Sequence, residues 1–221
     1  MSLERHVSAC VLANGDYRHD ERLLDIVQRS DLLIAADGGA NWLARHGLVP
    51  DVLVGDMDSV SREVRRSVEQ RGGRLVTAQR EKDETDLELA LLEAVALGSE
   101  TITILGVFGG RVDHAIANIC LLAMPALHGK DVRLYDGMTF VWLMDGVTEI
   151  RGQPGDLVSL IPFGQDVHGV RTLGLRYALH GETLLFGAAR GVSNVLTECV
   201  ATVEVGLGRL LVTHTPRVVR D

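Results

Sequence analysis

Two aspartates lie one residue apart in the stretch Gly55-Asp-Met-Asp-Ser59, directly after the apolar run Val52 to Val54. Two carboxylates at this spacing repel each other unless a cation or a proton lies between them. In isolation the stretch is typical of a solvated acidic turn, and Ser59 is placed to cap a helix that starts near Val60. The alternative is a metal site, and the other acidic residues decide between the two.

Further aspartates also follow strand-like apolar runs, so the acidic turn is not alone. The full set is Asp37, Asp56, Asp58, Asp83, Asp86 and Asp113. Ligands of parallel α/β sheets bind beyond the carboxyl ends of the strands, and we expect these side chains to converge there. Mg²⁺ prefers a few carboxylates together with waters and substrate phosphates. Asp56, Asp58 and Asp86 suit such a site, while Asp37 and Asp83 suit outer-sphere water or ribose hydroxyls.

Cations and glycines are set among these aspartates. Lys82, Arg111 and His114 suit phosphate oxygens, and Arg111 can bind them in a bidentate way. Gly38-Gly39 and Gly109-Gly110 precede predicted helices, where phosphate can approach backbone amides at the positive helix end. Taken singly, most of these residues are more typical of turns, helix caps or charged loops. Taken together, they favour a site for a phosphate compound and a divalent cation.

The elements that must position these residues alternate between strands and helices, which is typical of a parallel sheet covered on both faces. Predicted strands span 7–13, 32–36, 52–54, 75–78, 101–107 and 132–135. Predicted helices span 20–29, 60–71 and 115–126, with two more starting at Trp42 and at the capping box of Thr85 and Glu88. We therefore predict an α/β nucleotide-binding domain over residues 1–137.

The pattern changes after Gly137. Short apolar runs follow, separated by Gly, Pro and Asp, and no long helical period appears. This is typical of an all-β segment. We predict a β-sandwich over residues 138–221.

Composition and missing motifs exclude several classes of protein. The 221 residues carry a net charge of −8, which argues against nucleic acid as the main partner. The three cysteines, Cys10, Cys120 and Cys199, are far apart in apolar runs, so we expect buried, reduced thiols. The sequence has no Walker A, GxGxxG, GxSxG or HExxH motif. No signal peptide or membrane-spanning run is present, and we expect a cytoplasmic protein with no membrane partner.

Four motifs then occur in an order and spacing that resemble the thiamine pyrophosphokinase family. They are Asp37-Gly-Gly-Ala-Asn41, Gly55-Asp-Met-Asp-Ser59, Lys82-Asp-Glu-Thr-Asp86 and Gly109-Gly-Arg-Val-Asp-His114. In the second segment, Gly174-Leu-Arg-Tyr177 and Gly191-Val-Ser-Asn194 resemble the family's thiamine-binding β domain. The resemblance extends over nearly the whole chain. It implies a homodimer with thiamine between subunits, and transfer of the diphosphate of ATP to the hydroxyl of thiamine with release of AMP.

The resemblance also implies a role for each matching residue. Mg²⁺ is expected at Asp56, Asp58 and Asp86, with Asp37 close by. The ATP site is expected to comprise Asp37, Gly38, Asn41, Lys82, Asp83, Thr85, Gly109, Gly110, Arg111, Asp113 and His114. Thiamine is expected to contact Tyr177, Ser193 and Asn194. The residues expected to take part in catalysis are Asp58, Asp86, Arg111 and Asp113, and either Asp86 or Asp113 is a candidate to accept the hydroxyl proton. Lys82 has two possible partners, phosphate or thiamine.

Two other functions remain open at this stage. One keeps the fold and the ATP site but places the diphosphate on another small alcohol, such as a pterin. The other is a non-catalytic sensor of nucleotide or thiamine. A sensor is expected to lose some acidic ligands, whereas all the motif carboxylates are present in this chain.

Overall fold

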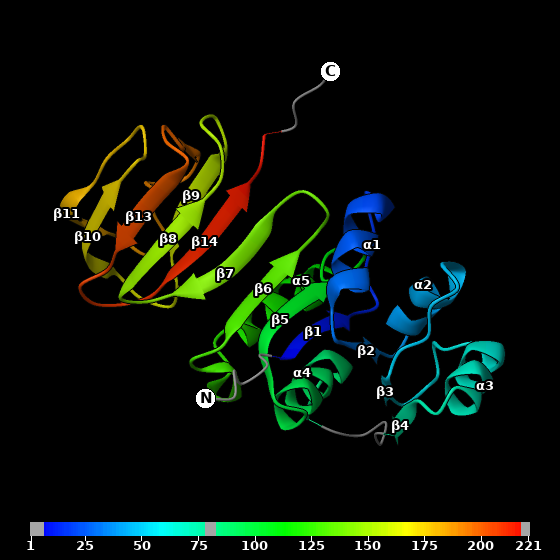
Figure 1. Ribbon diagram of the computed structural model, residues 1–221. Coiled ribbons are helices and arrows are strands. Elements are labelled where there is room, and N and C mark those ends of the chain that lie inside the picture. Colours follow the sequence, from blue (N-terminus) through cyan, green and yellow to red (C-terminus); the bar gives the residue numbers. More distant parts are fainter. Residues whose placement is uncertain (1–6, 78–82, 218–221) are drawn as a thin grey trace, which may run out of the picture. The chain divides into compact units, whose positions relative to one another are not determined.

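A computed structural model describes residues 7–77 and 83–217 of the chain. Its internal contacts divide the chain into two compact units, Met1–Gly137 (unit 1) and Met138–Asp221 (unit 2). Figure 1 shows helices and strands alternating in the first unit and strands predominating in the second.

Unit 1 is built on a parallel sheet. In spatial order its strands are β6 (Asp131–Tyr135), β5 (Ser99–Leu105), β1 (Val7–Leu12), β2 (Leu32–Ala36), β3 (Val52–Gly55) and β4 (Arg74–Thr77). The chain moves one way from β1 through β4 and then returns to the other side of β1 to form β5. This reversal makes the loops after β1 and β5 the topological switch point of the sheet, where such folds bind their ligands.

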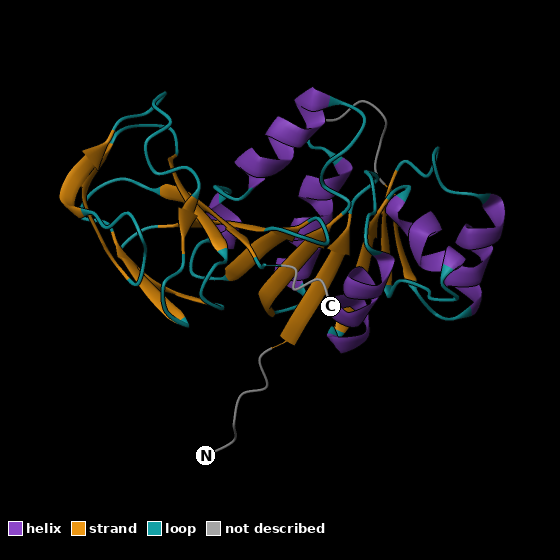
Figure 2. Cartoon of the chain, turned by 90° about the horizontal axis from the view of Figure 1, so that it is seen from above, coloured by secondary structure: helices purple, strands orange, loops and turns teal. Residues whose placement is uncertain are grey.

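Helices lie on both sides of this sheet, as Figure 2 shows. They are α1 (Asp20–Arg29), α2 (Gly39–Arg45), α3 (Arg62–Gln70), α4 (Asp86–Ala96) and α5 (Val112–Leu121), followed by a 3₁₀ turn at Pro125–Leu127. The central helix is α4, which packs on β1, β2, β3 and β5 through fully buried Ala90, Leu91 and Ala94. Burial of this apolar face holds the first turn of α4 against the ends of the strands.

The predicted elements of unit 1 are mostly present, with differences at their ends. The cap of α3 is Ser61, whose hydroxyl accepts the Val64 amide at 3.2 Å, so the assignment of that cap to Ser59 was wrong. Helix α5 begins three residues before the predicted position, and α2 begins at Gly39. The predicted cap at Thr85 is confirmed, because its hydroxyl accepts the Glu88 amide at 3.1 Å.

Unit 2 consists of two antiparallel sheets. One has the order β12 (Asn194–Val195), β9 (Leu157–Pro162), β14 (Leu210–Thr215) and β7 (Phe140–Met144). The other has the order β11 (His180–Leu184), β10 (Val167–Leu173), β13 (Val200–Glu204) and β8 (Val147–Arg151). Buried side chains from both sheets, among them Trp142, Leu160, Val170 and Val203, form one core. The unit is a β-sandwich, the architecture expected from the sequence.

Two of the three cysteines differ from expectation. Cys10 is buried in β1, where burial raises the pKa of its thiol. Cys120 and Cys199 are exposed, although each has an apolar residue directly after it in the sequence. Cys120 lies on α5, a helix that buries little of its surface, so apolar neighbours in sequence do not imply a buried position there.

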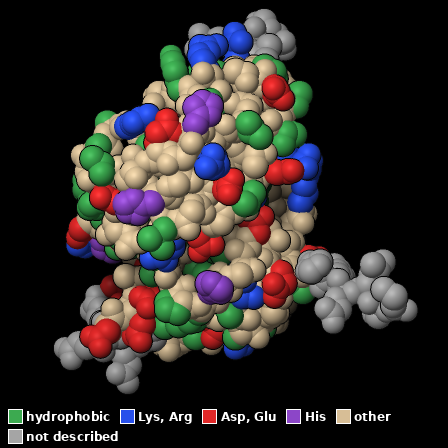
Figure 3. All heavy atoms as spheres, turned by 90° about the vertical axis from the view of Figure 1, so that its left-hand side faces the viewer, with side chains coloured by type: hydrophobic (Ala, Val, Ile, Leu, Met, Phe, Trp, Pro, Cys, Tyr) green, Lys and Arg blue, Asp and Glu red, His purple; other side chains and the backbone are tan. Residues whose placement is uncertain are grey.

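The face drawn in Figure 3 carries acidic and basic side chains interspersed with histidines and single hydrophobic side chains. Within the described residues, no helix has the length and hydrophobicity needed to cross a bilayer.

A buried carboxylate forms hydrogen bonds with residues near the start of β9 and near the end of β14 in unit 2. Asp156, 3% exposed, accepts hydrogen bonds from the amides of Gln153 (3.0 Å) and Arg217 (2.8 Å) and lies 2.9 Å from Nε2 of His214. Burial alone raises the pKa of Asp156, but the two amides and His214 outweigh burial and lower it below its ordinary value. A lowered carboxyl pKa stabilises the folded state above the unfolded pKa, and this contribution is lost as the pH falls through the folded pKa.

Replacing Asp156 by alanine is expected to reduce the free energy of unfolding by about 3 kcal/mol at pH 7, because His214 and two amides lose their acceptor. Urea unfolding at pH 7 and at pH 3 measures the effect. The variant should differ less from the parent at pH 3, where protonation has already weakened the network. If the variant and the parent differ by the same free energy of unfolding at pH 7 and pH 3, the result contradicts a charged Asp156 in the folded state at pH 7.

Candidate functional site

Three of the predicted aspartates converge at the carboxyl ends of β2 and β3. Asp37 follows β2, and Asp56 and Asp58 follow β3. One carboxylate oxygen from each lies within 4.8 Å of the others. Asp37 is buried, Asp56 is half-buried and Asp58 is exposed, so the group opens from the sheet edge towards solvent.

Backbone conformation and local hydrogen bonds position these three carboxylates. Asp37 has a left-handed φ of 44°, and its amide donates to Val54 O at 2.8 Å, which joins the ends of β2 and β3. The Asp58 amide donates to Asp56 Oδ1 at 3.0 Å, and the Ser59 hydroxyl donates to Asp58 Oδ1 at 3.0 Å. Met57 between them has a φ of 66°. The acidic turn is therefore held in an uncommon conformation with its carboxylates oriented.

Asn41, predicted to line the ATP site, fastens the acidic turn to helix α2. Its Nδ2 donates to Ser59 O at 2.8 Å, and its Oδ1 accepts the Ser61 amide at 3.3 Å. Both atoms of the amide group thus engage the backbone that leads from β3 into α3. In the structure Asn41 therefore positions the acidic turn.

The fourth predicted metal ligand, Asp86, lies beside Gly55. A Cβ placed on Gly55 would be 3.1 Å from Asp37 Cβ and 3.2 Å from the carboxyl carbon of Asp86. Gly55 has a φ of 143°, which side-chain-bearing residues rarely adopt. The glycine therefore leaves room for two acidic side chains to approach each other across the end of β3.

The environment of Asp37 would favour a bound cation. Burial raises the pKa of Asp37, the Ser59 hydroxyl lowers it, and the negative charges of Asp86 and Asp58 raise it further, with a net increase. Its Oδ1 atom is buried, and no described residue forms a hydrogen bond with it. A buried, unsatisfied carboxylate oxygen among other carboxylates is unfavourable unless a cation binds it. The donor set is all oxygen, which fits Mg²⁺.

In chelator-treated protein, Asp37→Asn is expected to raise the free energy of unfolding by about 1 kcal/mol at pH 7. The sign follows from the raised pKa, because an ionised group with a raised pKa destabilises the folded state above that pKa. Thermal unfolding should show Tm rising by about 2–4 °C. Glu63→Gln, on the exposed side of α3, is the control with no expected change. A lower Tm for the Asp37 variant contradicts this description of its environment.

Arg111 and Asp113 form a bidentate ion pair where the loop after β5 enters α5. Arg111 Nε and Nη2 donate to the two Asp113 oxygens at 3.1 and 2.5 Å. This contact lowers the pKa of Asp113 to about 2, and the His114 amide, which donates to Oδ1 at 3.0 Å, contributes. Gly110 has a φ of 66°, with open space beside its Cα among the described residues. The guanidinium of Arg111 and the open backbone of Gly110 are thus neighbours at the start of α5.

The loop after β1 is a part of the site that sequence reasoning missed. The Asp16 amide donates to Phe108 O at 2.6 Å. A Cβ on Gly15 would lie 2.3 Å from Gly106 O, and one on Gly109 would lie 2.3 Å from Asp16 Cγ. The two loops of the switch point therefore interlock. The Asn14-Gly15 dipeptide was the available signal, but it was interpreted only as the end of a strand.

The glycines at the start of α2 have a structural explanation. A Cβ on Gly38 would lie 2.1 Å from Asn14 Oδ1, and one on Gly39 would lie 2.2 Å from Leu12 O. The close approach of Gly39 to the backbone of β1 requires a glycine, whereas a side chain at Gly38 would displace only the Asn14 side chain.

The remaining predicted residues of unit 1 lie around α4 and α5. Asp83 is exposed just before α4, and the Thr85 hydroxyl caps that helix. His114 is exposed in the first turn of α5. Lys82 lies outside the described residues.

In unit 2 the two predicted thiamine-binding stretches lie side by side. The Tyr177 amide donates to Asn194 Oδ1 at 3.0 Å, and Asn194 Nδ2 donates to Tyr177 O at 2.8 Å. Tyr177 is 64% exposed, whereas Asn194 is 3% exposed. Ser193 has a left-handed φ of 60°, and its amide donates to the Ser159 hydroxyl at 3.1 Å. The structure thus brings together Tyr177, Ser193 and Asn194.

A hollow of about 520 Å³ lies beside the loop after β1. Asp16, Asp20, Arg45 and His46 are among its lining residues. Its aromatic wall is the ring of Tyr17, which stacks on Trp42 at 4.8 Å between centroids. The volume is in the range of small-molecule sites.

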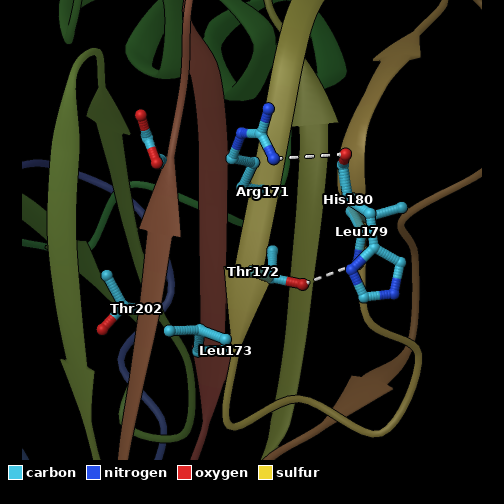
Figure 4. A pocket seen from close by; sticks show the side chains of 7 residues that line it. Arg171, Thr172, Leu173, Leu179, His180 and Thr202 are labelled. Atoms are coloured by element: carbon cyan, nitrogen blue, oxygen red, sulfur yellow. Dashed lines mark hydrogen bonds between the residues drawn. The ribbon is translucent and has the colours of Figure 1, made fainter.

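A smaller hollow of about 190 Å³ lies on the sheet formed by β10, β11 and β13 of unit 2 (Figure 4). Its polar groups bond to each other: Arg171 donates to His180 O at 3.4 Å, and Thr172 Oγ1 accepts the Leu179 amide at 2.9 Å. The lining residues include none of the predicted site residues, and we assign them no role in the site.

Comparison with known families gives two matches along the chain. Residues 23–135 match the family described as thiamin pyrophosphokinase, catalytic domain, and residues 147–210 match its vitamin B1 binding domain. The first match contains the carboxylate group and the Arg111–Asp113 pair. The second contains Tyr177, Ser193 and Asn194.

Individual relatives agree with the family matches. The chain is 30% identical to thiamine pyrophosphokinase of Bacillus subtilis over 203 residues, which cover 91% of this chain and 95% of the relative. The crystal structure of a Bacillus subtilis thiamine pyrophosphokinase superposes with a TM-score of 0.83 at 27% identity, over 96% of this chain and 100% of the other. The yeast enzyme superposes with a TM-score of 0.82 at 16% identity, over 97% of this chain and 87% of that one, and supports the fold alone.

Proposed function

The chain belongs to the thiamine pyrophosphokinase family, and we infer from this membership that it is a thiamine diphosphokinase. The reaction moves the diphosphate of ATP to the hydroxyl of thiamine and gives thiamine diphosphate and AMP. The observation that carries the assignment to this structure is the convergence of Asp37, Asp56 and Asp58 within a match to the catalytic domain. We propose that these residues and Asp86 form the centre of the site.

We propose Mg²⁺ as the cation of this centre. Asp37, Asp56 and Asp58 would hold it, with Asp86 beside Gly55, and the unsatisfied Asp37 Oδ1 supports the proposal. When bound, Mg²⁺ neutralises charge on the phosphates of ATP and aligns them for transfer. The Ser59 hydroxyl and Asn41 keep the acidic turn in place before the cation arrives.

ATP is proposed to extend from the carboxylates to the switch point. Gly110 leaves its backbone open, and the guanidinium N–H groups of Arg111 that do not bond to Asp113 can donate to a phosphate. The hollow beside Asp16 then accommodates the nucleoside end, because Asp16 contacts the glycine loop. The other predicted residues of the ATP site, Asp83, Thr85, Gly109 and His114, lie at or near the starts of α4 and α5.

Asp113 is better suited to orient Arg111 than to accept a proton. A carboxylate whose pKa is about 2 is a weak base at neutral pH, where a general base works best with a pKa near the operating pH. Of the two candidates from the sequence, Asp86 is therefore the one we propose to accept the hydroxyl proton of thiamine. Positioning and charge neutralisation remain the main contributions, as phosphoryl transfer requires little covalent chemistry from the protein.

We further propose a cytoplasmic homodimer with thiamine at the subunit interface, as the family resemblance implies. An exposed apolar face on α5 supports a partner surface, since Val112 is 72% exposed and Ile116 is 58% exposed. Sedimentation of active protein as a monomer contradicts the shared-site proposal.

Product analysis tests the function. Purified protein is incubated with ATP, MgCl₂ and thiamine, and the products are identified by mass. We expect thiamine diphosphate and AMP in equal amounts, and none with chelator or with a hydroxymethylpterin in place of thiamine. ADP as the nucleotide product, or AMP formed without thiamine, contradicts the proposal. A protein that binds both ligands without turnover supports the sensor alternative.

A further inference from the structure

Segments 174–177 and 194–197 run beside each other in unit 2 as a short ladder. The Thr197 amide donates to Gly174 O at 2.9 Å, and the Arg176 amide donates to Val195 O at 2.9 Å. Leu175 and Leu196 form an antiparallel bridge between these two bonds. The ladder leads directly towards Tyr177.

At Tyr177 the ladder continues through a side chain. The backbone of Asn194 pairs with Val158 of β9. Its side-chain amide bonds to Tyr177 in both directions, through Oδ1 at 3.0 Å and Nδ2 at 2.8 Å. The same Oδ1 also accepts the Val195 amide at 2.9 Å. The carboxamide thus replaces a peptide group, which is possible because it carries the same donor and acceptor.

These bonds use most of the hydrogen-bonding capacity of the Asn194 side chain, which was expected to contact thiamine. Both lone pairs of Oδ1 and one of the two N–H groups are used, and the residue is 3% exposed. Tyr177, in contrast, is 64% exposed, and its backbone is held at both N and O. An aromatic side chain on a backbone held in this way offers a flat face to a heterocyclic cation, and with only two side-chain torsions it loses little entropy on binding.

We propose that Asn194 is a positioning residue, which holds Tyr177 so that its ring packs against thiamine, and that Asn194 itself does not bind the substrate. This inference rests on the proposed function for the identity of the ligand. It replaces the direct contact that family resemblance implies for Asn194 with an indirect role through Tyr177.

A double-mutant cycle tests the proposal. Tyr177→Ala and Asn194→Ala are each expected to raise KM for thiamine about tenfold, with KM for ATP unchanged. Because one acts through the other, the double variant should resemble Tyr177→Ala alone. If the two effects instead multiply, so that KM for thiamine rises about a hundredfold in the double variant, the proposal is overturned. Independent effects would require a separate contact of Asn194 with thiamine. Thr197→Ala, in the same ladder but bonded through its backbone, is the control with unchanged KM.

Hydrogen exchange on thiamine-free protein provides a readout that does not depend on activity. The Tyr177 amide should exchange at least about tenfold faster in Asn194→Ala than in the parent chain and in Thr197→Ala. Unchanged exchange overturns the proposal. If the alanine variant does not fold, Asn194→Leu serves in both experiments, since leucine is close to asparagine in size and lacks both the acceptor for the Tyr177 amide and the donor to Tyr177 O. A parent chain without thiamine turnover contradicts the proposed function, while the exchange experiment still tests the role of Asn194.

Discussion

Asp58→Asn is expected to lower kcat about 10³-fold while the protein remains folded. Asp58 is the most exposed of the three grouped carboxylates and therefore, in the proposed site, the most accessible to a metal–nucleotide complex. Asparagine keeps the shape and the hydrogen bond with the Ser59 hydroxyl, but removes the charge. A loss of this size is typical when one group that stabilises transition-state charge is removed.

Steady-state kinetics with saturating ATP and Mg²⁺ measure this effect, and thermal unfolding checks the fold. Glu63→Gln is the matched control, because it removes one exposed negative charge from α3 outside the carboxylate group. The control should retain the parent kcat. Near-normal turnover of the Asp58 variant shows that the carboxylate group is not the metal site.

Gly55→Ala is expected to have the second largest effect, with kcat/KM lower by about 10²-fold. The added methyl group would lie 3.1 Å from Asp37 Cβ and 3.3 Å from Asp86 Oδ1. Either carboxylate must move by several tenths of an ångström, which disturbs the ligand geometry. Stability should fall as well, because alanine is strained at a φ of 143°.

Gly47→Ala separates strain from crowding. Gly47 also has a positive φ, 71°, but a Cβ there meets no described atom within 4 Å. It should lose stability to a similar extent without loss of kcat/KM, as measured by urea unfolding and steady-state kinetics. Equal loss of activity in both variants contradicts a specific role for the space at Gly55.

Much of the fold follows from local pattern. The bounds of α1 and β2 agree with the predicted ranges, because apolar periodicity and flanking polar residues define both. The short apolar runs of unit 2 predicted strands but not their pairing. β12 has only two residues, and its pairing depends on β9, about 35 positions earlier in the chain. The alternation of apolar and polar residues within a short segment does not predict such long-range pairing.

The convergence of Asp37, Asp56 and Asp58 was predictable because strand ends in a parallel sheet meet at one edge. The exact positions of their carboxylates could not be predicted from the sequence. Ser59 was expected to cap α3, but its hydroxyl donates to Asp58 and Ser61 caps the helix. Asn41 forms hydrogen bonds with Ser59 and Ser61, which lie 18 and 20 positions later in the sequence. The bonds of Asn194 to Tyr177 span 17. Only the folded chain brings these partners together, so sequence reasoning could identify the residues and not their partners.

The central claim is that the grouped carboxylates bind the divalent cation of the reaction. Electron paramagnetic resonance with Mn²⁺ in place of Mg²⁺, in the presence of a non-hydrolysable ATP analogue, tests it most directly. We predict that the parent chain and Glu63→Gln bind Mn²⁺ with equal affinity, and that Asp58→Asn binds it at least about tenfold more weakly. Equal Mn²⁺ affinity in all three proteins would contradict the account.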